Sequence, residues 1–82
     1  MPYDSKAFGI VISRLRTEKE LTQQAFAEAA QIARSHLTEL ENGNKIPRLD
    51  TFFRIAEALD LSPVELMRLV EAETMCRMLQ EF

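Results

Sequence analysis

The stretch from Thr22 to Asn42 fits two short helices joined by a tight turn, and it constrains the fold more than any other part of the chain. Its apolar members can meet in one small core, and they are Phe26, Ala27, Ala30, Ile32, Leu37 and Leu40. Its polar members then lie along one outward edge, and they are Gln23, Arg34, Ser35, His36, Thr38 and Glu39. Glycine occurs only twice in the chain and runs of β-branched residues are missing, so we expect no strands.

The N-terminal half predicts helices over about 5–19, 22–29 and 34–41, with a turn at 30–33 between the last two. Thr22 is a good N-cap for the second helix, and Gly43 stands where a left-handed residue would close the third. Gly9 lies inside the first helix, where glycine costs about 1 kcal/mol relative to alanine, so we expect a close backbone approach there. The apolar period of the first helix is carried by Phe8, Val11, Ile12 and Leu15.

A fourth helix is expected over about 49–59, and a fifth from Ser62 to about residue 80. Ser62 can act as N-cap, Pro63 suits the first turn and Glu65 completes a capping box. The apolar residues that the fourth helix is expected to turn inward are Leu49, Phe52, Ile55, Ala56 and Leu59. The sequence therefore predicts an all-α fold, a compact five-helix bundle with an extended C-terminal helix, in a single domain over 1–82.

Length and composition exclude several classes of protein. The 82 residues leave no room for a separate catalytic module, and a hydrophobic content of 46% is too high for a disordered tail. No run of about 18 apolar residues and no secretion signal is present, so we expect a cytoplasmic protein that does not bind membranes. Cys76 and His36 are the only residues of their kinds, which excludes an internal disulfide and argues against a metal site. No catalytic triad or carboxylate pair can be built, so we expect no enzyme, no cofactor and no small-molecule ligand.

The net charge of −3 conceals an uneven distribution. Residues 1–48 carry seven Lys/Arg and six Asp/Glu, a net charge of +1, whereas residues 49–82 carry three and seven, a net charge of −4. Attraction to phosphate depends on the local field at one face rather than on the total charge. The charge therefore permits a nucleic-acid ligand at the N-terminal half.

In order and spacing, these residues resemble the phage-repressor and Cro type of helix-turn-helix proteins (XRE-like) over about residues 8–67. The motifs that carry the resemblance are Phe8-Gly9, Arg16, Leu21-Thr22-Gln23, Ala27, Ile32, Leu37, Glu41-Asn42-Gly43, Pro47, Ile55-Ala56, Leu59 and Ser62-Pro63 followed by Glu65-Leu66. The small size and long last helix are also similar to the controller proteins of restriction–modification systems. The resemblance implies a helix-turn-helix at 22–42 whose second helix enters the major groove of double-stranded DNA.

Three residues of the outward edge are the first candidates for DNA contacts. Gln23 lies at the start of a helix, where free N–H groups favour a phosphate, and the resemblance implies that it clamps the backbone; the alternative is a polar first-turn residue. Arg34 can give two bonds to guanine or reach a phosphate instead. Ser35 can bond bases or the backbone.

The other residues of this edge each have more than one interpretation. Glu39 can accept from a cytosine amine, or it can orient Arg34 or another cation. Thr38 can offer its methyl group to thymine or its hydroxyl to phosphate, or remain solvated. His36 can contact the backbone or bases, or remain solvated.

The loop after the third helix holds short amides and cations, which suit phosphate contacts that set the register on DNA. These residues are Asn42, Asn44, Lys45 and Arg48. The resemblance allows Arg48 to reach the minor groove, where it would sense the width of the groove. The alternative is a solvated loop without a ligand.

The resemblance also implies that Arg16 and Glu41 pair across the first and third helices, which makes them structural rather than base-reading. The chain departs from the family at two positions of the turn. The family often has Gly where this chain has Gln31, and Ser or Thr as N-cap where it has Ala33. A left-handed residue other than glycine costs about 1–2 kcal/mol and an alanine cap about 1 kcal/mol, so we expect a less stable turn.

The last helix is taken as a dimerisation element over 62–82. Its apolar stripe could instead belong to the core of its own chain, but four packed helices leave little surface to cover it. The residues expected at a dimer interface are Leu69, Ala72, Met75, Cys76, Met78, Leu79 and Phe82. Flexible methionines suit a self-complementary two-fold patch. A homodimer would place two recognition helices about 34 Å apart, one turn of duplex DNA.

These observations predict a sequence-specific transcriptional regulator that binds a palindromic operator as a homodimer. It would repress by blocking RNA polymerase or activate by touching it, and the resemblance implies that autoregulation is common. The competing hypothesis is a protein-binding module, an antitoxin or adaptor, whose apolar last helix grips a different partner. Self-association favours the regulator, whereas a monomer that co-purifies with a toxin-like protein favours the module.

Overall fold

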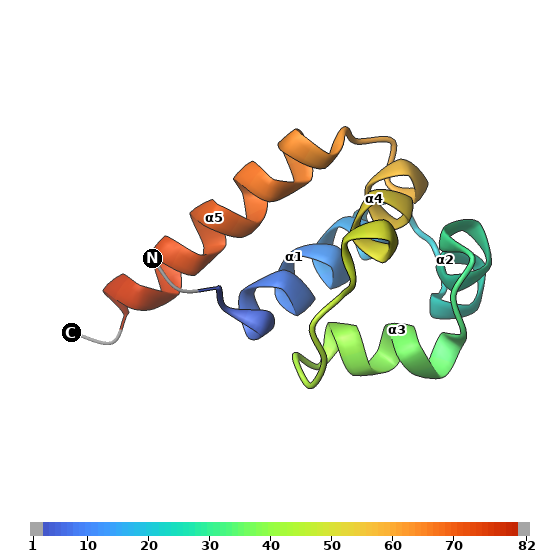
Figure 1. Ribbon diagram of the computed structural model, residues 1–82, viewed down its shortest axis with the longest axis horizontal. Helices are drawn as coiled ribbons and strands as arrows, with labels where there is room; N and C mark the ends of the chain where they lie inside the picture. Colours follow the sequence, from blue (N-terminus) through green and yellow to red (C-terminus); the bar gives the residue numbers. More distant parts are fainter. Residues whose placement is uncertain (1–2, 81–82) are drawn as a thin grey trace.

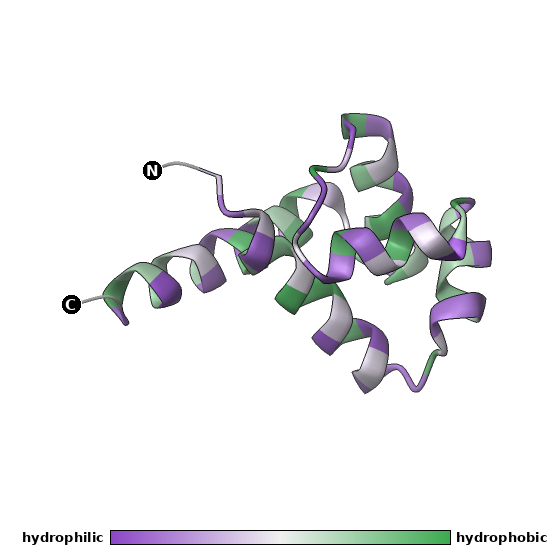
Figure 2. Ribbon diagram, turned by 90° about the horizontal axis from the view of Figure 1, so that it is seen from below, coloured by the Kyte–Doolittle hydropathy of each residue, from purple (hydrophilic) through white to green (hydrophobic). Residues whose placement is uncertain are grey.

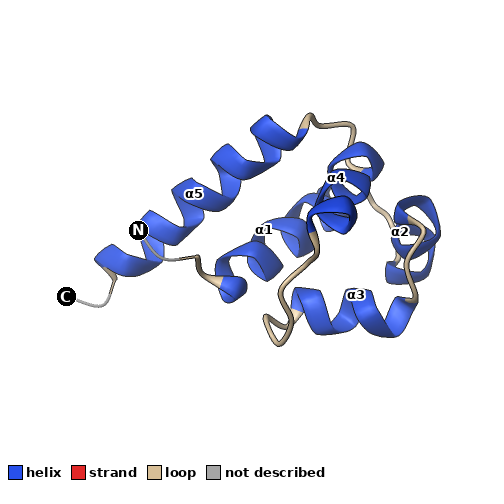
Figure 3. Cartoon of the chain, viewed as in Figure 1, coloured by secondary structure: helices blue, strands red, loops and turns tan. Residues whose placement is uncertain are grey.

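The computed structural model describes residues 3–80, and over this range the chain forms five helices and no strand (Figure 3). The helices are α1 (Ser5–Glu18), α2 (Gln23–Ala30), α3 (Arg34–Glu41), α4 (Leu49–Ala58) and α5 (Pro63–Leu79). The all-α prediction is confirmed, and every predicted helix end lies within about one residue of the observed one, which is the usual uncertainty of a helix boundary.

Helices α1 and α5 lie side by side and run in opposite directions, while α2, α3 and α4 close the other end of the molecule (Figure 1). The core lies between these helices, and the rings of Phe8 and Phe52 meet in it with their centroids 5.8 Å apart. The largest fully buried side chains are Phe8, Phe26, Ile12, Leu37, Leu40, Ile55, Leu59, Leu66 and Val11. Every helix therefore contributes to one apolar core, in which each buried large side chain is worth about 1.5–3 kcal/mol.

The C-terminal part of α5 extends beyond the other helices (Figure 1). Two ion pairs attach this part of the helix to α1 and to the residue before it. Arg14 Nη1 lies 3.3 Å from Glu73 Oε1, and Arg77 Nε lies 2.8 Å from Asp4 Oδ2. The extended helix is thus anchored at its side and is not a free arm.

Gly9 lets α1 approach the end of α3 closely, as its place inside a helix predicted. A Cβ atom at this position would lie 2.6 Å from the carbonyl oxygen of Leu40 and would also collide with that of Glu41. Because both obstacles are backbone atoms, they cannot turn away as a flexible side chain could. This contact fixes α3 relative to α1.

Side-chain caps explain why three of the helices begin where they do. Asp4 accepts a hydrogen bond from the backbone N–H of Lys6 at 2.9 Å, and Thr22 accepts one from Ala25 at 3.0 Å. Ser62 and Glu65 form the predicted capping box, with reciprocal bonds of 3.1 and 2.9 Å. Each cap satisfies an N–H group that has no partner inside its helix and contributes about 1 kcal/mol.

The prediction that Leu49 points inward is wrong. Its side chain is 72% exposed, whereas Phe52, Ile55, Ala56 and Leu59 are buried as expected. Leu49 is the first residue of α4, and side chains of a first turn lean back toward the N-terminal end of their helix. Here that direction leads away from the core and toward the exposed side chain of Ile46 in the preceding loop.

Over residues 3–80, no helix is both long enough and apolar enough to cross a lipid bilayer.

Candidate nucleic-acid interface

Helix α3 is held against the body by one face and leaves the other in solvent. Leu37 and Leu40 are fully buried, while Arg34 and Ser35 at the start of the helix are exposed. Seen from below in Figure 2, α3 lies toward the viewer and most of its ribbon is hydrophilic. The helix therefore presents its polar start outward, and an α-helix fits into the major groove of duplex DNA.

The middle of α3 is more closely held than its start. His36, Thr38 and Glu39 are all half-buried. The predicted alternative in which Glu39 orients Arg34 is not realised, because no ion pair or hydrogen bond joins these two described residues. Glu39 thus keeps its carboxylate available as an acceptor.

The turn between α2 and α3 has the strained geometry that its sequence predicted. Gln31 adopts a left-handed conformation with φ 59° and ψ 43°, and Ala33 caps α3 without a side-chain hydrogen bond. The turn is closed by backbone bonds from Gln31 N–H to the carbonyl of Glu28 and from Ile32 N–H to that of Ala27, at 3.1 and 3.0 Å. The chain therefore forms the turn with unfavourable residues at two positions, at a cost of about 1–2 kcal/mol for the first alone.

A polar network joins α1, α2 and α3 beneath the exposed edge. Glu41 receives hydrogen bonds from Arg16 Nε at 2.7 Å and Nη2 at 3.2 Å, and Arg16 Nη1 donates to the Leu21 carbonyl at 2.8 Å. Gln23 Nε2 donates to Glu41 at 2.9 Å, and its Oε1 lies 3.3 Å from the hydroxyl of Thr38. Arg16 and Glu41 thus have the expected structural pairing, and Gln23 keeps one of its two amide hydrogens for another acceptor.

The loop after α3 begins with the left-handed glycine that the sequence predicted. Gly43 has φ 77°, and the N–H groups of Gly43 and Asn44 donate to the carbonyls of Leu40 and Glu39 at 3.1 and 3.0 Å. This pattern satisfies the last carbonyls of α3. The residues of this loop that are candidates for phosphate contacts are all exposed, and they are Asn42, Asn44, Lys45 and Arg48. Arg48 Nε lies 3.3 Å from Asp50 Oδ1, so this guanidinium already has a carboxylate neighbour.

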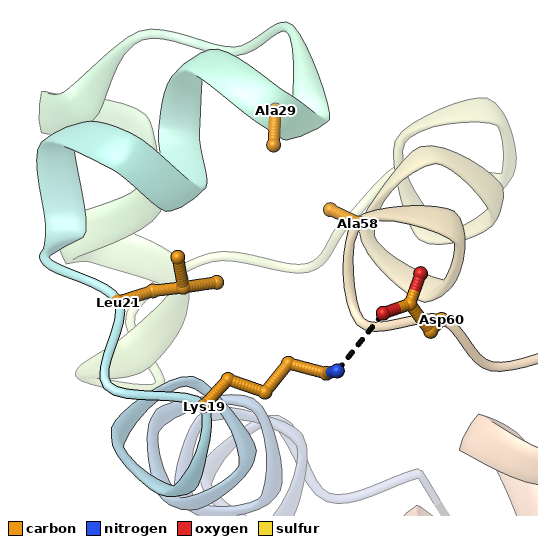
Figure 4. A pocket seen from close by; sticks show the side chains of 5 residues that line it. All are labelled: Lys19, Leu21, Ala29, Ala58 and Asp60. Atoms are coloured by element: carbon orange, nitrogen blue, oxygen red, sulfur yellow. Dashed lines mark hydrogen bonds and ion pairs between the residues drawn. The ribbon is translucent and has the colours of Figure 1, made fainter.

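The cations of the chain fall into two groups. Those that form ion pairs are Arg14, Arg16, Lys19, Arg48, Arg54 and Arg77. Lys19, for example, lies 2.9 Å from Asp60 beside a shallow hollow that Leu21, Ala29 and Ala58 also line (Figure 4). Those that form none within residues 3–80 are Lys6, Arg34, Lys45 and Arg68. Two of these four, Arg34 and Lys45, belong to the predicted DNA-binding edge.

Two basic residues near the interface were missed by the sequence analysis. Arg54 Nε donates to the carbonyl of Ala30 at 3.1 Å, so it satisfies the end of α2 immediately before the turn. Lys6 lies beside the loop after α3, with its Nζ atom 3.5 Å from the carbonyl oxygen of Asn42. Both contacts join residues far apart in the chain, and no local pattern in the sequence signals them.

The α5 residues that were expected at a dimer interface differ in how far they are buried. Leu69 is partly buried and packs against the core of its own chain. Met75, Met78 and Leu79 are exposed by 53, 42 and 70%, and Cys76 is exposed as well. Phe82, the last expected interface residue, lies outside the described residues.

A comparison with known families identifies the fold independently. The model of the helix-turn-helix family HTH_3 matches residues 12–66. A relative from Sinorhizobium fredii, the uncharacterised HTH-type transcriptional regulator y4dJ, is 37% identical over 62 residues. That match covers 76% of this chain and 80% of the relative.

Two solved structures show the same arrangement of helices. The clp gene regulator ClgR from Corynebacterium glutamicum superposes with a TM-score of 0.89 at 25% identity, over 98% of this chain and 85% of that one. The restriction–modification controller protein C.AhdI from Aeromonas hydrophila superposes with a TM-score of 0.74 at 35% identity, over 77% of this chain and 96% of that one. The chain therefore belongs to the helix-turn-helix (HTH_3) family of transcriptional regulators.

Proposed function

We propose that this chain regulates transcription by binding a palindromic operator in double-stranded DNA as a homodimer. The observation that carries the proposal is the start of α3, where Arg34 and Ser35 are exposed while Leu37 and Leu40 hold the helix in the core. Arg34 forms no ion pair within residues 3–80, so its guanidinium is available to a ligand. Membership of the helix-turn-helix family supports the same function.

Each residue of the edge has a role that its chemistry supports. Arg34 gives two hydrogen bonds to a guanine edge, a bidentate pair worth about 1–3 kcal/mol of discrimination, and Glu39 accepts one from a cytosine amine. Ser35, His36 and Thr38 contact bases or backbone beside them. The remaining amide hydrogen of Gln23 donates to a phosphate at the start of α2, where the helix dipole favours negative charge.

The loop after α3 supplies contacts that do not read sequence. Asn42, Asn44 and Lys45 bind phosphates, because short amides and cations suit that role. Arg48 enters the minor groove only after it leaves Asp50, which costs little because the pair is exposed. These contacts set the register of α3 on the duplex.

Selection of bound duplexes from random DNA tests this proposal. The wild-type chain should enrich a two-fold motif whose half-sites lie about one helical turn apart. Arg34→Ala should keep the fold, because the side chain is exposed, but should relax the preference for guanine at one position of each half-site. No enrichment by the wild type, or an unchanged motif with the variant, would contradict the assignment.

We propose a dimer interface on the apolar surface that continues from the loop after α3 onto α4 and α5. Tyr3, Ile46, Leu49 and Met67 line one apolar hollow of about 220 Å³. They remain exposed by 47, 72, 72 and 47%, respectively. Contiguous exposed apolar surface is typical of protein–protein contact.

Helical spacing extends this surface along α5. Met78 follows Met67 by three turns, so the two residues lie on one side of the helix, and Met75 lies close to that side. Leu69 is left out of the interface because it packs against its own core. The proposed surface thus overlaps the predicted stripe at Met75 and Met78 and adds residues outside α5.

Two leucines of equal exposure test where the subunits meet. Leu49 is 72% and Leu79 is 70% exposed, so Leu49→Glu and Leu79→Glu should each disturb the folded monomer little. Sedimentation at micromolar concentration should show a dimer for the wild type and for Leu79→Glu, and a monomer for Leu49→Glu. Dissociation by Leu79→Glu alone would place the interface on the C-terminal stripe instead, and a monomeric wild type would refute the homodimer.

We further propose that the chain controls its own gene, as an autoregulatory controller of a restriction–modification system. The similarity to the controller protein C.AhdI at 35% identity supports this assignment. A footprint on the promoter of the chain's own gene should protect the motif obtained by selection. Protection only at other promoters would refute autoregulation without affecting the proposed DNA binding.

A further inference from the structure

Lys6 belongs to the same surface as the loop after α3. Its Nζ atom lies 3.5 Å from the carbonyl oxygen of Asn42, and the neighbouring Ser5 hydroxyl donates to the carbonyl of Gly43 at 2.9 Å. A Cβ atom at Gly43 would lie 2.8 Å from Cγ and 3.0 Å from Cα of Lys6. The start of α1 is therefore packed directly against the loop that carries the proposed phosphate ligands.

The ammonium group of Lys6 is only weakly engaged in the folded chain, through the long hydrogen bond of 3.5 Å to the Asn42 carbonyl. The side chain is exposed and forms no ion pair within residues 3–80. It occupies the second position of α1, where the helix dipole is positive and a cation is unfavourable. Asp4 caps this helix end, but its carboxylate pairs with Arg77 rather than with the ammonium group.

Four cations form no ion pair within residues 3–80, and three of them lie at the start of α3, in the loop after it, and at the start of α1. They are Arg34, Lys45 and Lys6. The first two already belong to the proposed interface, and the contacts with Asn42 and Gly43 attach the third to it. Among the described residues, positive charge without a carboxylate partner thus gathers beside the recognition helix.

We propose that the ammonium group of Lys6 binds a backbone phosphate of the duplex, next to the phosphates that the loop contacts. This inference rests on the proposed DNA binding and extends the interface from α2, α3 and the loop onto α1. An ammonium group acts on phosphate as a point charge and releases a condensed counterion. The contact therefore raises affinity for every sequence by the same factor and adds no discrimination between bases.

Lys6→Gln tests the proposal, with Arg68→Gln as the matched control. Both residues are exposed cations that form no ion pair within the described part of the chain, and both variants remove one positive charge, but Arg68 lies on α5. Affinity is measured over a range of NaCl concentrations for the selected duplex and for an unrelated duplex. The plot of log K against log[NaCl] has a negative slope, and Lys6→Gln should make it less steep by about 0.9 for each bound subunit. The variant should also weaken binding to both duplexes by the same factor. Arg68→Gln should leave the slope unchanged.

The possible outcomes separate this inference from the proposed function. Equal slopes for Lys6→Gln and wild type, on DNA that both bind, would refute the role of Lys6 alone. Weaker binding of only the selected duplex would mean that Lys6 reads bases, which also contradicts the proposal. A wild type that binds neither duplex would overturn the DNA-binding function together with this inference. The urea midpoint of Lys6→Gln checks that the variant folds, and it should stay close to that of the wild type, because the side chain is exposed and its hydrogen bond to Asn42 is long, at 3.5 Å.

Discussion

Glu41→Gln should destabilise the protein strongly, because it breaks the polar network beneath the recognition helix. The Glu41 side chain is 6% and that of Arg16 is 17% exposed, so water can replace few of the hydrogen bonds that the variant loses. In the variant, one carboxylate oxygen becomes an NH₂ group. That group cannot accept the hydrogen bond that Arg16 Nε now donates over 2.7 Å.

The size of the stability loss in Glu41→Gln depends on the contacts that Arg16 retains in the variant. Removing one partner of a buried ion pair costs about 3–5 kcal/mol, because the other charge is left without compensation. Arg16 retains its 2.8 Å bond to the Leu21 carbonyl and some access to water, which favours the lower end of this range. We therefore expect a loss of about 3 kcal/mol, out of a total of roughly 4–12 kcal/mol for a domain of this length.

Urea unfolding measures this loss, and Glu73→Gln is the control. That variant removes an ion pair of 3.3 Å whose arginine, Arg14, is 46% exposed, and it should cost less than about 1 kcal/mol. A double-mutant cycle with Arg16→Met should give a coupling energy of at least about 1.5 kcal/mol. Equal losses for Glu41→Gln and Glu73→Gln, or a coupling near zero, would refute the reasoning.

Three further changes give separate expectations. Gln31→Gly should raise stability by about 1 kcal/mol in urea unfolding and leave DNA affinity unchanged, because glycine adopts φ 59° without the steric cost. Gly9→Ala should lower stability by about 1–3 kcal/mol despite better helix propensity, and should weaken DNA binding, because its Cβ displaces the Leu40 end of α3. The hydrogen bond from Arg77 is the main reason that the pKa of Asp4 lies below its usual value in the folded chain. The contribution of this lowered pKa to the free energy of unfolding is complete above the unfolded pKa and is lost as the pH falls through the folded pKa. Asp4→Asn should therefore lower stability at pH 7 and reduce the dependence of stability on pH at acidic pH.

The helices and the exposed start of α3 could be predicted because their signals are local. Thr22 and Ser62 satisfy N–H groups within three residues of themselves, so the sequence alone indicates where α2 and α5 begin. The buried leucines at 37 and 40 fix the rotation of α3, and Arg34 then falls on the outer face.

Positions that depend on contacts between distant residues were not predictable in this way. Lys6 and Asn42 are separated by 36 positions in the chain, and only the packing of α1 against α3 brings them together. Leu49 fits the apolar period of α4, but a period does not tell whether the first turn of a helix reaches the core. Glu20 and Asp60 adopt φ 59° without a glycine to signal it, since backbone bonds at the ends of α1 and α4 hold them there.

The loop between α3 and α4 lies at the meeting of two proposed surfaces. Lys45 belongs to the one that contacts phosphate, and the next residue, Ile46, belongs to the one that contacts the second subunit. A partner subunit on Ile46 would also restrict the neighbouring Lys45, so DNA would meet a loop that is already ordered. In that case subunit association and operator affinity would strengthen each other by the same factor. Occupancy of the promoter would rise more steeply than the concentration of the protein, which gives an autoregulated gene a threshold.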